Sequence, residues 1–314
     1  MYSILLSLLV CQLAFRPAVS DLHFQVFGDW GMGNKQQKLV AMAMMKNAVI
    51  TKPNFIVNVG DNFYKHKDSD GEKQGGVNNL EDPLWKEYFE SVYIDYLRNI
   101  PFYSLLGNHD YMGNISAQLL YHSKSPRWYL PSPSYHITVQ VDEQTTALFV
   151  FLDTSPIIVD YYKHPENTKM ADNLKKLDPK QQLEWLEHVL NTTSANWRFV
   201  VGHHPIISST TASLLTEQDM NMVDTIIQKY SVQAYFSGHI HQLEHHNDNN
   251  IDYFISGAGA TGRSYVTNPK GLRTLNWFGQ DAGFLNVTLS KDLMTAQFLG
   301  TDLSVLHTSH TPII

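Results

Sequence analysis

The chain has 314 residues, of which 43% are hydrophobic and 17% are charged, a composition that is ordinary for a globular protein. Its formal net charge is −7 at pH 7 and it contains no basic run, which argues against nucleic-acid binding. Beyond residue 20, no apolar stretch reaches the length needed to span a membrane, so we expect no membrane span in the mature chain.

Residues 1–20 have the pattern of a secretory signal peptide. Ile4–Phe15 is an apolar segment too short to cross a bilayer, and Ala-Val-Ser at 18–20 is a small-x-small cleavage site. Cleavage there removes Cys11, the only cysteine, so we expect a secreted or endolysosomal chain without disulfides. A buried N-terminal strand is the alternative interpretation. Export also agrees with three candidate N-glycosylation sites, at Asn114, Asn191 and Asn286.

Short β-rich segments alternate with helical patterns along most of the chain. The first half predicts strands at 22–27, 55–59, 102–106, 134–141 and 146–152, with helices at 35–50 and 85–97. The second half predicts helices at 179–190 and 217–230, with strands at 197–201, 234–236, 251–255, 283–289 and 294–299. This alternation favours mixed β-sheets covered by helices, and the β-only ending favours two sheets packed face to face. We therefore predict an α/β (α+β) fold, with residues 21–314 as one domain.

Five of the predicted strands end in glycine followed at once by a residue that can bind a metal. These turns are Gly28-Asp29, Gly60-Asp61, Gly107-Asn108-His109, Gly202-His203 and Gly238-His239-Ile240-His241. Ligands gather at the carboxyl ends of strands in open α/β sheets, and glycine lets the backbone turn sharply off a strand. One such pair alone usually marks a turn or a helix cap. Five in one chain predict a single pocket lined with oxygen and nitrogen donors.

The residue types at these turns indicate the kind of ion. They include no thiolate, so a usual structural zinc site is excluded, whereas carboxylate, imidazole, amide and phenol groups suit Fe, Zn or Mn. Seven protein donors are too many for one open catalytic ion and suit two ions that share a bridging carboxylate. The spacing in His239-Ile240-His241 puts both imidazoles on one side of an extended segment, so that each can reach one ion.

The motifs GDWG, GDNFY, GNHD, VGHH and GHIH resemble, in order and spacing, those of the purple acid phosphatases. They are most similar to the small tartrate-resistant type within the metallophosphoesterase superfamily, over about residues 22 to 300. The tyrosine of GDNFY, Tyr64, separates this group from most other metallophosphoesterases. The resemblance implies a four-layer sandwich, in which two mixed β-sheets pack face to face and are flanked by helices.

The resemblance also implies a role for each donor. The implied ligands are Asp29, Tyr64 and His241 for Fe(III), Asn108, His203 and His239 for a divalent ion (Fe, Zn or Mn), and Asp61 for a bridge between the two. His109 would be catalytic, facing the substrate to stabilise the phosphate or help protonate the leaving group. The expected reaction is that of an acid phosphatase, in which a metal-bound hydroxide attacks a phosphate monoester in line and releases an alcohol and inorganic phosphate.

One position departs from the family pattern. Relatives of the animal type usually carry another histidine nine residues after the ligand at position 203, and here Ala212 stands in that place. The candidate replacements are His66, His204 and His245. His204 follows a ligand in a segment expected to be extended, so its side chain should point the other way, packed or hydrogen-bonded. Asp110 is expected either to orient the imidazole of His109 or to cap the following turn.

Two other functions stay open. The first is a related metallophosphoesterase acting on diesters or nucleotides, against which Tyr64 argues. The second is a non-catalytic structural protein of the same fold, similar to the glideosome-associated membrane anchors, which typically have degraded ligand sets and a C-terminal transmembrane segment. This chain keeps all seven implied ligands and shows no such segment, which favours the hydrolase.

Overall fold

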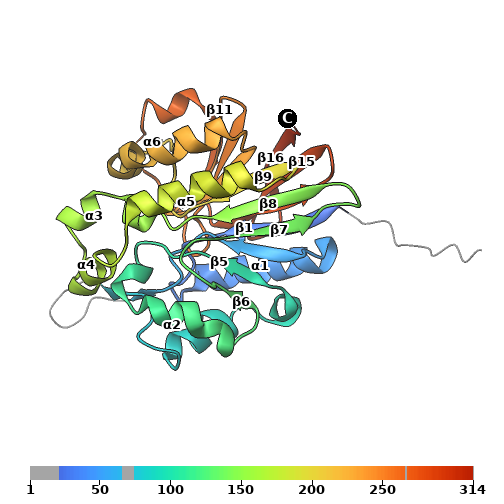
Figure 1. The fold of residues 1–314 in the computed structure, drawn as a ribbon. Coiled ribbons are helices and arrows are strands. Elements are labelled where there is room, and N and C mark those ends of the chain that lie inside the picture. The colour runs from blue at the N-terminus through green and yellow to red at the C-terminus, as the bar shows by residue number, and fades with distance from the viewer. Residues whose placement is uncertain (1–20, 66–73, 266, 314) are drawn as a thin grey trace, which may run out of the picture.

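The computed structural model describes residues 21–65, 74–265 and 267–313. Two seven-stranded mixed β-sheets lie face to face and are flanked by helices, which confirms the predicted fold class (Figure 1). The predicted signal peptide at 1–20 and His66 lie outside the described residues. Within the described ranges, no helix combines the length and the apolar character that crossing a membrane requires.

The first sheet brings together strands from both ends of the chain. Its order is β16 (Val305–Pro312), β15 (Leu293–Gly300), β14 (Gly283–Leu289), β1 (Leu22–Phe27), β2 (Phe55–Asn58), β5 (Phe102–Ser104) and β6 (Trp128–Tyr129). Strands β1, β2, β5 and β6 run parallel to one another, whereas β14 runs antiparallel to β1. The carboxyl ends of β1, β2 and β5 therefore meet at one edge of the sheet.

The second sheet is formed by the middle of the chain. Its order is β13 (Leu275–Gly279), β11 (Leu243–Asp248), β12 (Ile251–Ser256), β10 (Ala234–Ser237), β9 (Trp197–Val201), β8 (Thr146–Phe151) and β7 (Tyr135–Gln140). Strands β8, β9, β10 and β12 are parallel, so their carboxyl ends also meet at one edge. A two-stranded ribbon, β3 (Tyr64–Lys65) with β4 (Gln74–Gly75), stands apart from both sheets.

Aromatic side chains join the two sheets. The ring centre of Phe24 in β1 lies 5.2 Å from that of Phe149 in β8 and 6.0 Å from that of Phe236 in β10. Phe55 of β2 contacts Phe149 at 5.3 Å. All four side chains are buried, and removing apolar area from water, at about 25 cal/mol per Å², is the main force that holds the layers together.

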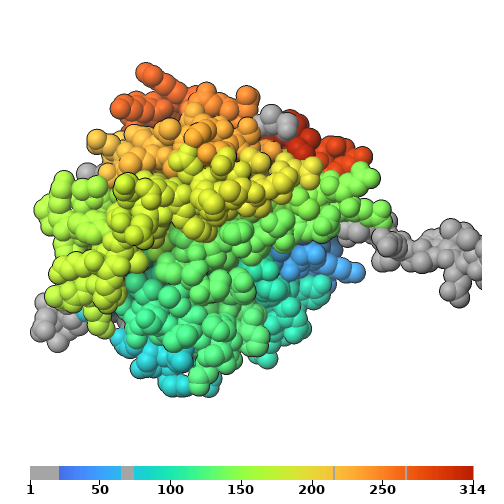
Figure 2. Space-filling model, viewed as in Figure 1, coloured from blue at the N-terminus to red at the C-terminus, as the bar shows by residue number. Residues whose placement is uncertain are grey.

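Helices cover the outer faces of the sheets. The longest are α1 (Lys35–Thr51), α5 (Pro179–Thr192) and α6 (Leu214–Lys229), and the shorter ones are α2 (Ile115–Leu120), α3 (Asp160–Lys163) and α4 (Thr168–Leu174). α5 and α6 lie over the second sheet, and their yellow and orange side chains form a continuous cover on the face seen in Figure 2. Asp178 caps the start of α5, because its side chain accepts a hydrogen bond from the backbone of Lys180, and Pro179 is the first helical residue.

The single helix predicted over residues 85–97 is wrong. The structure has one π-helical turn at Trp85–Glu90 and a separate 3-10 turn at Asp95–Asn99. Between them Ile94 is extended and Asp95 has a φ of +54°, so the backbone cannot continue as one helix. The apolar residues at helical spacing nevertheless all face the core: Trp85, Phe89, Tyr93 and Leu97.

The sequence did not predict β11, β13 or β16. The segment Leu-Glu-His-His-Asn-Asp of β11 lacks the alternation of apolar and polar residues that is typical of strands. Its Glu244 and His246 are nevertheless fully buried, because Nε2 of His246 lies 2.7 Å from the Glu244 carboxylate and each satisfies the other. The burial of this strand therefore depends on polar pairing that local hydrophobicity does not report.

The three candidate glycosylation sites differ in exposure. Asn114, which caps α2, and Asn191, near the end of α5, are both exposed. Asn286 lies in β14 with only 5% of its surface exposed, so a glycan on its amide does not fit the folded chain. Glycosylation stays a prediction for Asn114 and Asn191 only.

Candidate metal centre

The seven side chains implied as metal ligands lie together where strands of both sheets end. They follow β1, β2 and β5 of the first sheet and β9 and β10 of the second. Contacts of 2.8 to 3.5 Å between their oxygen and nitrogen atoms connect all of them. We call this group the donor cluster; its members are Asp29, Asp61, Tyr64, Asn108, His203, His239 and His241.

The turns that carry the donors are tight. Asp29, Asp61 and His239 have φ angles of +57°, +53° and +67°, a left-handed conformation that is uncommon outside glycine and concentrates at functional sites. The glycine before each donor was expected to make the turn. Of the five glycines, only Gly60, with a φ of +95°, has the left-handed conformation that this requires. Gly107 is needed for space, because a Cβ there would lie 2.2 Å from Oδ1 of Asp61. In three of the five turns the donor residue itself therefore turns the chain.

Tyr64 lies at the centre of one half of the donor cluster. Its hydroxyl oxygen is 3.0 Å from Oδ1 of Asp29, 2.8 Å from Oδ2 of Asp61 and 3.1 Å from Nε2 of His241. A hydroxyl has one proton and cannot donate to all three. Burial, and then the charges of Asp29 and Asp61, raise the pKa of Tyr64 well above its ordinary value. The phenolate therefore forms here only when a cation offsets those charges.

Asn108 lies at the centre of the other half. Its side-chain oxygen is 3.1 Å from Nε2 of His203 and 3.0 Å from Nδ1 of His239. Nδ1 of His203 lies 2.8 Å from the carbonyl oxygen of Val59. A carbonyl oxygen can only accept a hydrogen bond, so Nδ1 of His203 carries a proton. If the imidazole is neutral, Nε2 carries none, and its lone pair faces the side-chain oxygen of Asn108. Such a contact needs a proton or a cation between the two atoms.

A proton satisfies only part of this arrangement. Burial disfavours the charged imidazole, but Asp61 outweighs it and raises the pKa of His203 to about 9. Burial, followed by the charge of His203, lowers the pKa of His239 to about 3, so that second imidazole stays neutral. Nδ1 of His241 is also buried, and it has no hydrogen-bond partner within the described part of the chain.

The donor cluster gathers oxygen and nitrogen donors around two buried carboxylates, and this fits bound cations. Asp29 and Asp61 are 0% and 2% exposed, and their ion pairs among the described residues are with imidazoles, not with lysine or arginine. Burying two carboxylates without a compensating cation is costly. The mixture of carboxylate, phenol, amide and imidazole matches the preference of iron, zinc and manganese rather than that of a structural thiolate site.

His109 lies beside the donor cluster and is only partly buried. Its ring centre is 4.4 Å from that of Tyr64, and its backbone nitrogen donates to Oδ1 of Asp61 at 2.9 Å. Its Nδ1 is buried and has no hydrogen-bond partner in the described residues. The imidazole is therefore available to a ligand that enters next to the donors.

Asp110 links the loop after β2 to the loop after β5 through hydrogen bonds. Its carboxylate accepts hydrogen bonds from the backbone of Asn62 at 3.1 Å, from the backbone of Gly107 at 2.9 Å and from the side chain of Gln118 at 2.8 Å. Burial, and then the charge of Asp61, raise the pKa of Asp110 to about 7. The carboxylate makes no bond to the ring of His109. Its backbone partners all come earlier in the chain, and the 3-10 turn that follows has no side-chain cap, so both expected roles, orienting His109 and capping the following turn, are wrong.

The position without the family histidine is on the surface. Ala212 is exposed in the 3-10 turn Thr211–Ser213. Of the candidate replacements, His245 is wrong: it lies between the two sheets, with its ring nitrogens 2.9 Å from Asp252 and 3.0 Å from His307. The structure thus leaves His204 as the described candidate next to the donor cluster.

His204 is buried and hydrogen-bonded, as expected, but it does not point away from the site. Its ring centre lies 4.6 Å from that of His239, because the chain bends at 203–204 instead of continuing β9. His203, His204 and His239 are close enough to form a three-imidazole site. However, Nδ1 of His204 lies 2.8 Å from the hydroxyl of Thr154, and its Nε2 lies 2.8 Å from the hydroxyl of Tyr161. We therefore place His204 behind the donors. Sequence reasoning missed both hydroxyls; the only signal was the position of Thr154 just after β8.

Comparisons with known proteins agree with this geometry. A family model described as calcineurin-like phosphoesterase matches residues 18–243. Tartrate-resistant acid phosphatase type 5 of Homo sapiens is 29% identical over 93% of each chain, and purple acid phosphatase 7 of Arabidopsis thaliana is 33% identical over 92% of this chain and 85% of its own. Among solved structures, GAP50, the anchor in the inner membrane complex of Plasmodium, has a TM-score of 0.78 at 26% identity, covering 94% of this chain and 90% of that one.

Proposed function

Because the chain belongs to the calcineurin-like phosphoesterase family, and within it to the purple acid phosphatases of the tartrate-resistant type, we propose that it hydrolyses phosphate monoesters with a pair of metal ions. The observation that carries this proposal is the donor cluster, in which seven side chains of four chemical types face one another around two buried carboxylates. We propose Fe(III) as one ion and Fe(II), Zn or Mn as the other.

Each half of the donor cluster suits one of these ions. The half around Tyr64 supplies anionic oxygens, from that phenol and from Asp29, which stabilise a trivalent ion. The half around Asn108 supplies an amide and two imidazoles, whose neutral donors suit a divalent ion. Asp61 contacts both halves, through Oδ2 to Tyr64 and through Oδ1 to His203, so we assign it as the bridge.

In the proposed reaction, the residues of the chain hold the metal ions and orient the groups that take part. When bound, the two ions would supply a nucleophile from water at acid pH and would neutralise charge on the phosphate. The Val59 carbonyl fixes the ring of His203 through Nδ1, which keeps Nε2 directed at the centre. The partly exposed imidazole of His109 would bind a phosphate oxygen or give a proton to the departing alcohol.

Two alternative functions use the same fold. A structural role rests on the similarity to GAP50, an anchor in its own membrane complex. A role as a diester or nucleotide hydrolase would share the metals but not depend on Tyr64. The monoesterase is favoured because all seven donors are in contact, including the phenol, and an anchor does not require such a cluster of metal-binding side chains.

The purified protein tests these alternatives directly. We expect two metal ions per chain, a violet colour from tyrosinate-to-Fe(III) charge transfer, and monoesterase activity with an acidic optimum across a substrate panel. Tyr64→Phe should bleach the colour, whereas the exposed control Tyr129→Phe should leave it unchanged. A colourless, iron-free but active protein would favour the diesterase, and a protein with no metal and no activity would favour the structural role.

We also propose that the chain is exported to the cell exterior or to an endolysosomal compartment. The pattern of residues 1–20 and the exposure of Asn114 and Asn191 support this. Expression in a eukaryotic host should give a mature N-terminus near Asp21. Asn114→Gln with Asn191→Gln should abolish any mobility shift on glycosidase treatment, and Asn286→Gln should change nothing. An uncleaved, unglycosylated product would contradict the proposal.

A further inference from the structure

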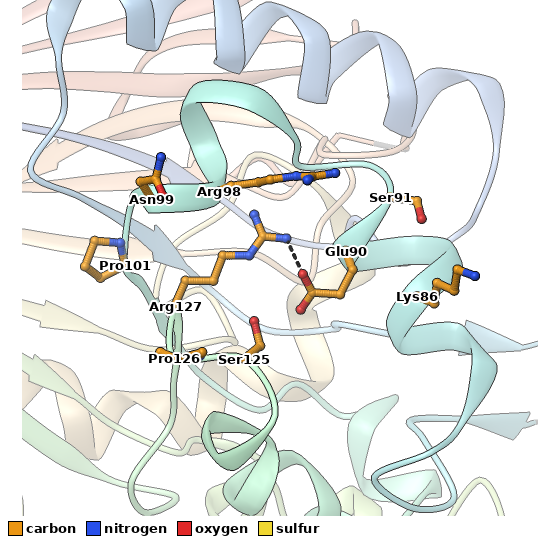
Figure 3. A pocket seen from close by; sticks show the side chains of 9 residues that line it. All are labelled: Lys86, Glu90, Ser91, Arg98, Asn99, Pro101, Ser125, Pro126 and Arg127. Atoms are coloured by element: carbon orange, nitrogen blue, oxygen red, sulfur yellow. Dashed lines mark hydrogen bonds and ion pairs between the residues drawn. The ribbon is translucent and has the colours of Figure 1, made fainter.

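A second hollow lies at the opposite end of the first sheet from the donor cluster. It has a volume of about 670 Å³, and its lining includes Pro101, Pro126 and Arg127, which precede β5 and β6 (Figure 3). β5 leads from this hollow toward Gly107 and Asn108, so the two sites lie at opposite ends of one short strand. We call it the basic hollow, because three of its lining residues are cations, Lys86, Arg98 and Arg127, and only Glu90 is an anion.

A partly buried ion pair forms the floor of the basic hollow. The side chain of Arg127 is 6% exposed and donates to Oε2 of Glu90 at 2.8 Å and to the carbonyl of Leu97 at 3.2 Å. Its guanidinium also lies 4.3 Å from the ring centre of Phe89. The other oxygen of Glu90 accepts a hydrogen bond from Tyr121 at 3.4 Å. Both oxygens of the one carboxylate are therefore already bonded within the protein.

Within the described part of the chain, the other two cations have no counter-ion. Lys86 and Arg98 are exposed, and neither takes part in an ion pair with any residue that the structure describes. Figure 3 shows the guanidinium groups of Arg98 and Arg127 one above the other at the same opening. Burial lowers the pKa of Arg127, Glu90 opposes this, and the nearby charge of Arg98 lowers it further. Like charges thus face a common space on a chain whose net charge is −7.

We propose that the basic hollow binds a phosphorylated small molecule through its phosphate group, at a site separate from the metal centre. Lys86, Arg98 and the hydroxyls of Ser91 and Ser125 offer hydrogen-bond donors from several directions, which suits the oxygens of a tetrahedral anion better than a planar carboxylate. The volume exceeds that of one phosphate ion, and Pro101 and Pro126 add apolar wall, so the ligand carries an organic part.

Equilibrium dialysis of the metal-loaded protein with radiolabelled inorganic phosphate tests the site. We expect two phosphate sites per chain in the wild type and one in the double variant Lys86→Ser with Arg98→Ser. The control Lys291→Ser with Arg273→Ser has the same change in charge at exposed positions outside the hollow and should keep two sites. A wild type with no more sites than the double variant overturns the proposal.

The result does not depend on the proposed hydrolase. The measured quantity is the difference of one site between the wild type and the double variant, which stays the same if the metal centre binds no phosphate. Lys86 and Arg98 are exposed, so the double variant should keep its melting temperature and any phosphatase activity.

Phenylphosphonate, which cannot be hydrolysed to phosphate and alcohol, tests the organic part of the ligand. At the site lost in the double variant it should bind at least about tenfold more tightly than inorganic phosphate, because its ring adds apolar contact with Pro101 and Pro126. Equal or weaker binding would limit the ligand to inorganic phosphate and overturn that part of the proposal.

Discussion

Two of the groups of buried histidines and carboxylates that the structure describes are built differently. In the group between the two sheets, Nε2 of His245 is 2.9 Å from Asp252, and its Nδ1 is 3.0 Å from Nε2 of His307 on β16. Asn247 and Thr311 also donate to the Asp252 carboxylate. Each acceptor in this inter-sheet cluster therefore faces a donor, and the cluster joins β11 and β12 to β16.

The donor cluster, by contrast, gathers seven metal-binding side chains around two buried carboxylates, and Nδ1 of His241 has no hydrogen-bond partner among the described residues. The hydroxyl of Tyr64 is shared among two carboxylates and an imidazole, and the oxygen of Asn108 faces two imidazole nitrogens. Both groups contain histidine and aspartate, so residue type does not distinguish a metal site from a structural one. The number and chemical variety of the converging donors does, and this makes the contrast testable.

The largest expected effect is that of Asp61→Ala, which removes the proposed bridge. The variant should lose both metal ions and at least about a thousandfold in kcat/KM, because neither half of the cluster is complete without this carboxylate. Metal analysis and phosphatase kinetics measure the two losses. Asp292→Ala, at an exposed position, is the control. A metal content near that of the wild type would contradict the assignment.

Asp252→Ala should act on stability and leave the metals in place. It deprives the buried His245 and Thr311, and the exposed Asn247, of their acceptor, and leaving the two buried donors unpaired should lower the free energy of unfolding by about 3 kcal/mol. Urea denaturation of the metal-loaded protein measures this. If the variant lost metal instead, the inter-sheet cluster would not be the independent structural element described above.

Asp153 is an intermediate case, because its buried carboxylate accepts from the Tyr111 hydroxyl and from the backbone of Ser155 but forms no ion pair with a residue that the structure describes. Burial raises its pKa to about 7 against an ordinary value near 3.9, although the Tyr111 bond opposes this. The stability it contributes is therefore complete below about pH 4 and is lost as the pH rises through about 7.

The variant Asp153→Asn should remove this pH dependence. Relative to the wild type it should gain unfolding free energy between pH 5 and 7, by at most about 1.4 kcal/mol per pH unit. Urea midpoints of both proteins at pH 5 and pH 7.5 measure the gain. The same difference at both pH values would show that Asp153 does not titrate in this range.

The smallest effect is expected for Ser309→Ala. The hydroxyl of Ser309 is 3.4 Å from Nε2 of His245, and that nitrogen already has Asp252 at 2.9 Å. Removing the hydroxyl should cost about 0.5 kcal/mol or less in urea denaturation. A loss as large as that of Asp252→Ala would mean that the hydroxyl, and not the carboxylate, holds the cluster together.

The sequence predicted those strands whose residues are apolar by themselves. β1, β2, β9 and β14 are recognisable because their burial follows from local hydrophobicity. β11 and β16 are not, because their buried polar side chains are satisfied by partners on other strands, as His245 is by Asp252 and His307. Long-range pairing of this kind leaves no periodic signal in the chain.

For the site, the motifs predicted which donors come together but not the backbone that holds them. Asp29 itself adopts the left-handed turn that had been attributed to Gly28, and His204 turns toward His239 because the chain bends after β9. Tyr161 has no motif around it and reaches the site only through the fold. The assignment of the seven donors to particular ions stays a prediction.

The donors come from turns that are far apart along the chain, and this fixes the order in which the protein can assemble. The backbone nitrogen of His239 donates to Oδ2 of Asp29 across 210 positions. Closing so long a loop carries a large entropic cost that only extensive contact between the sheets offsets, and topologies of this kind fold slowly. The aromatic interface must dock before a cation can be captured. Metal binding is then one of the last steps of folding, and it occurs only after the two sheets have packed together.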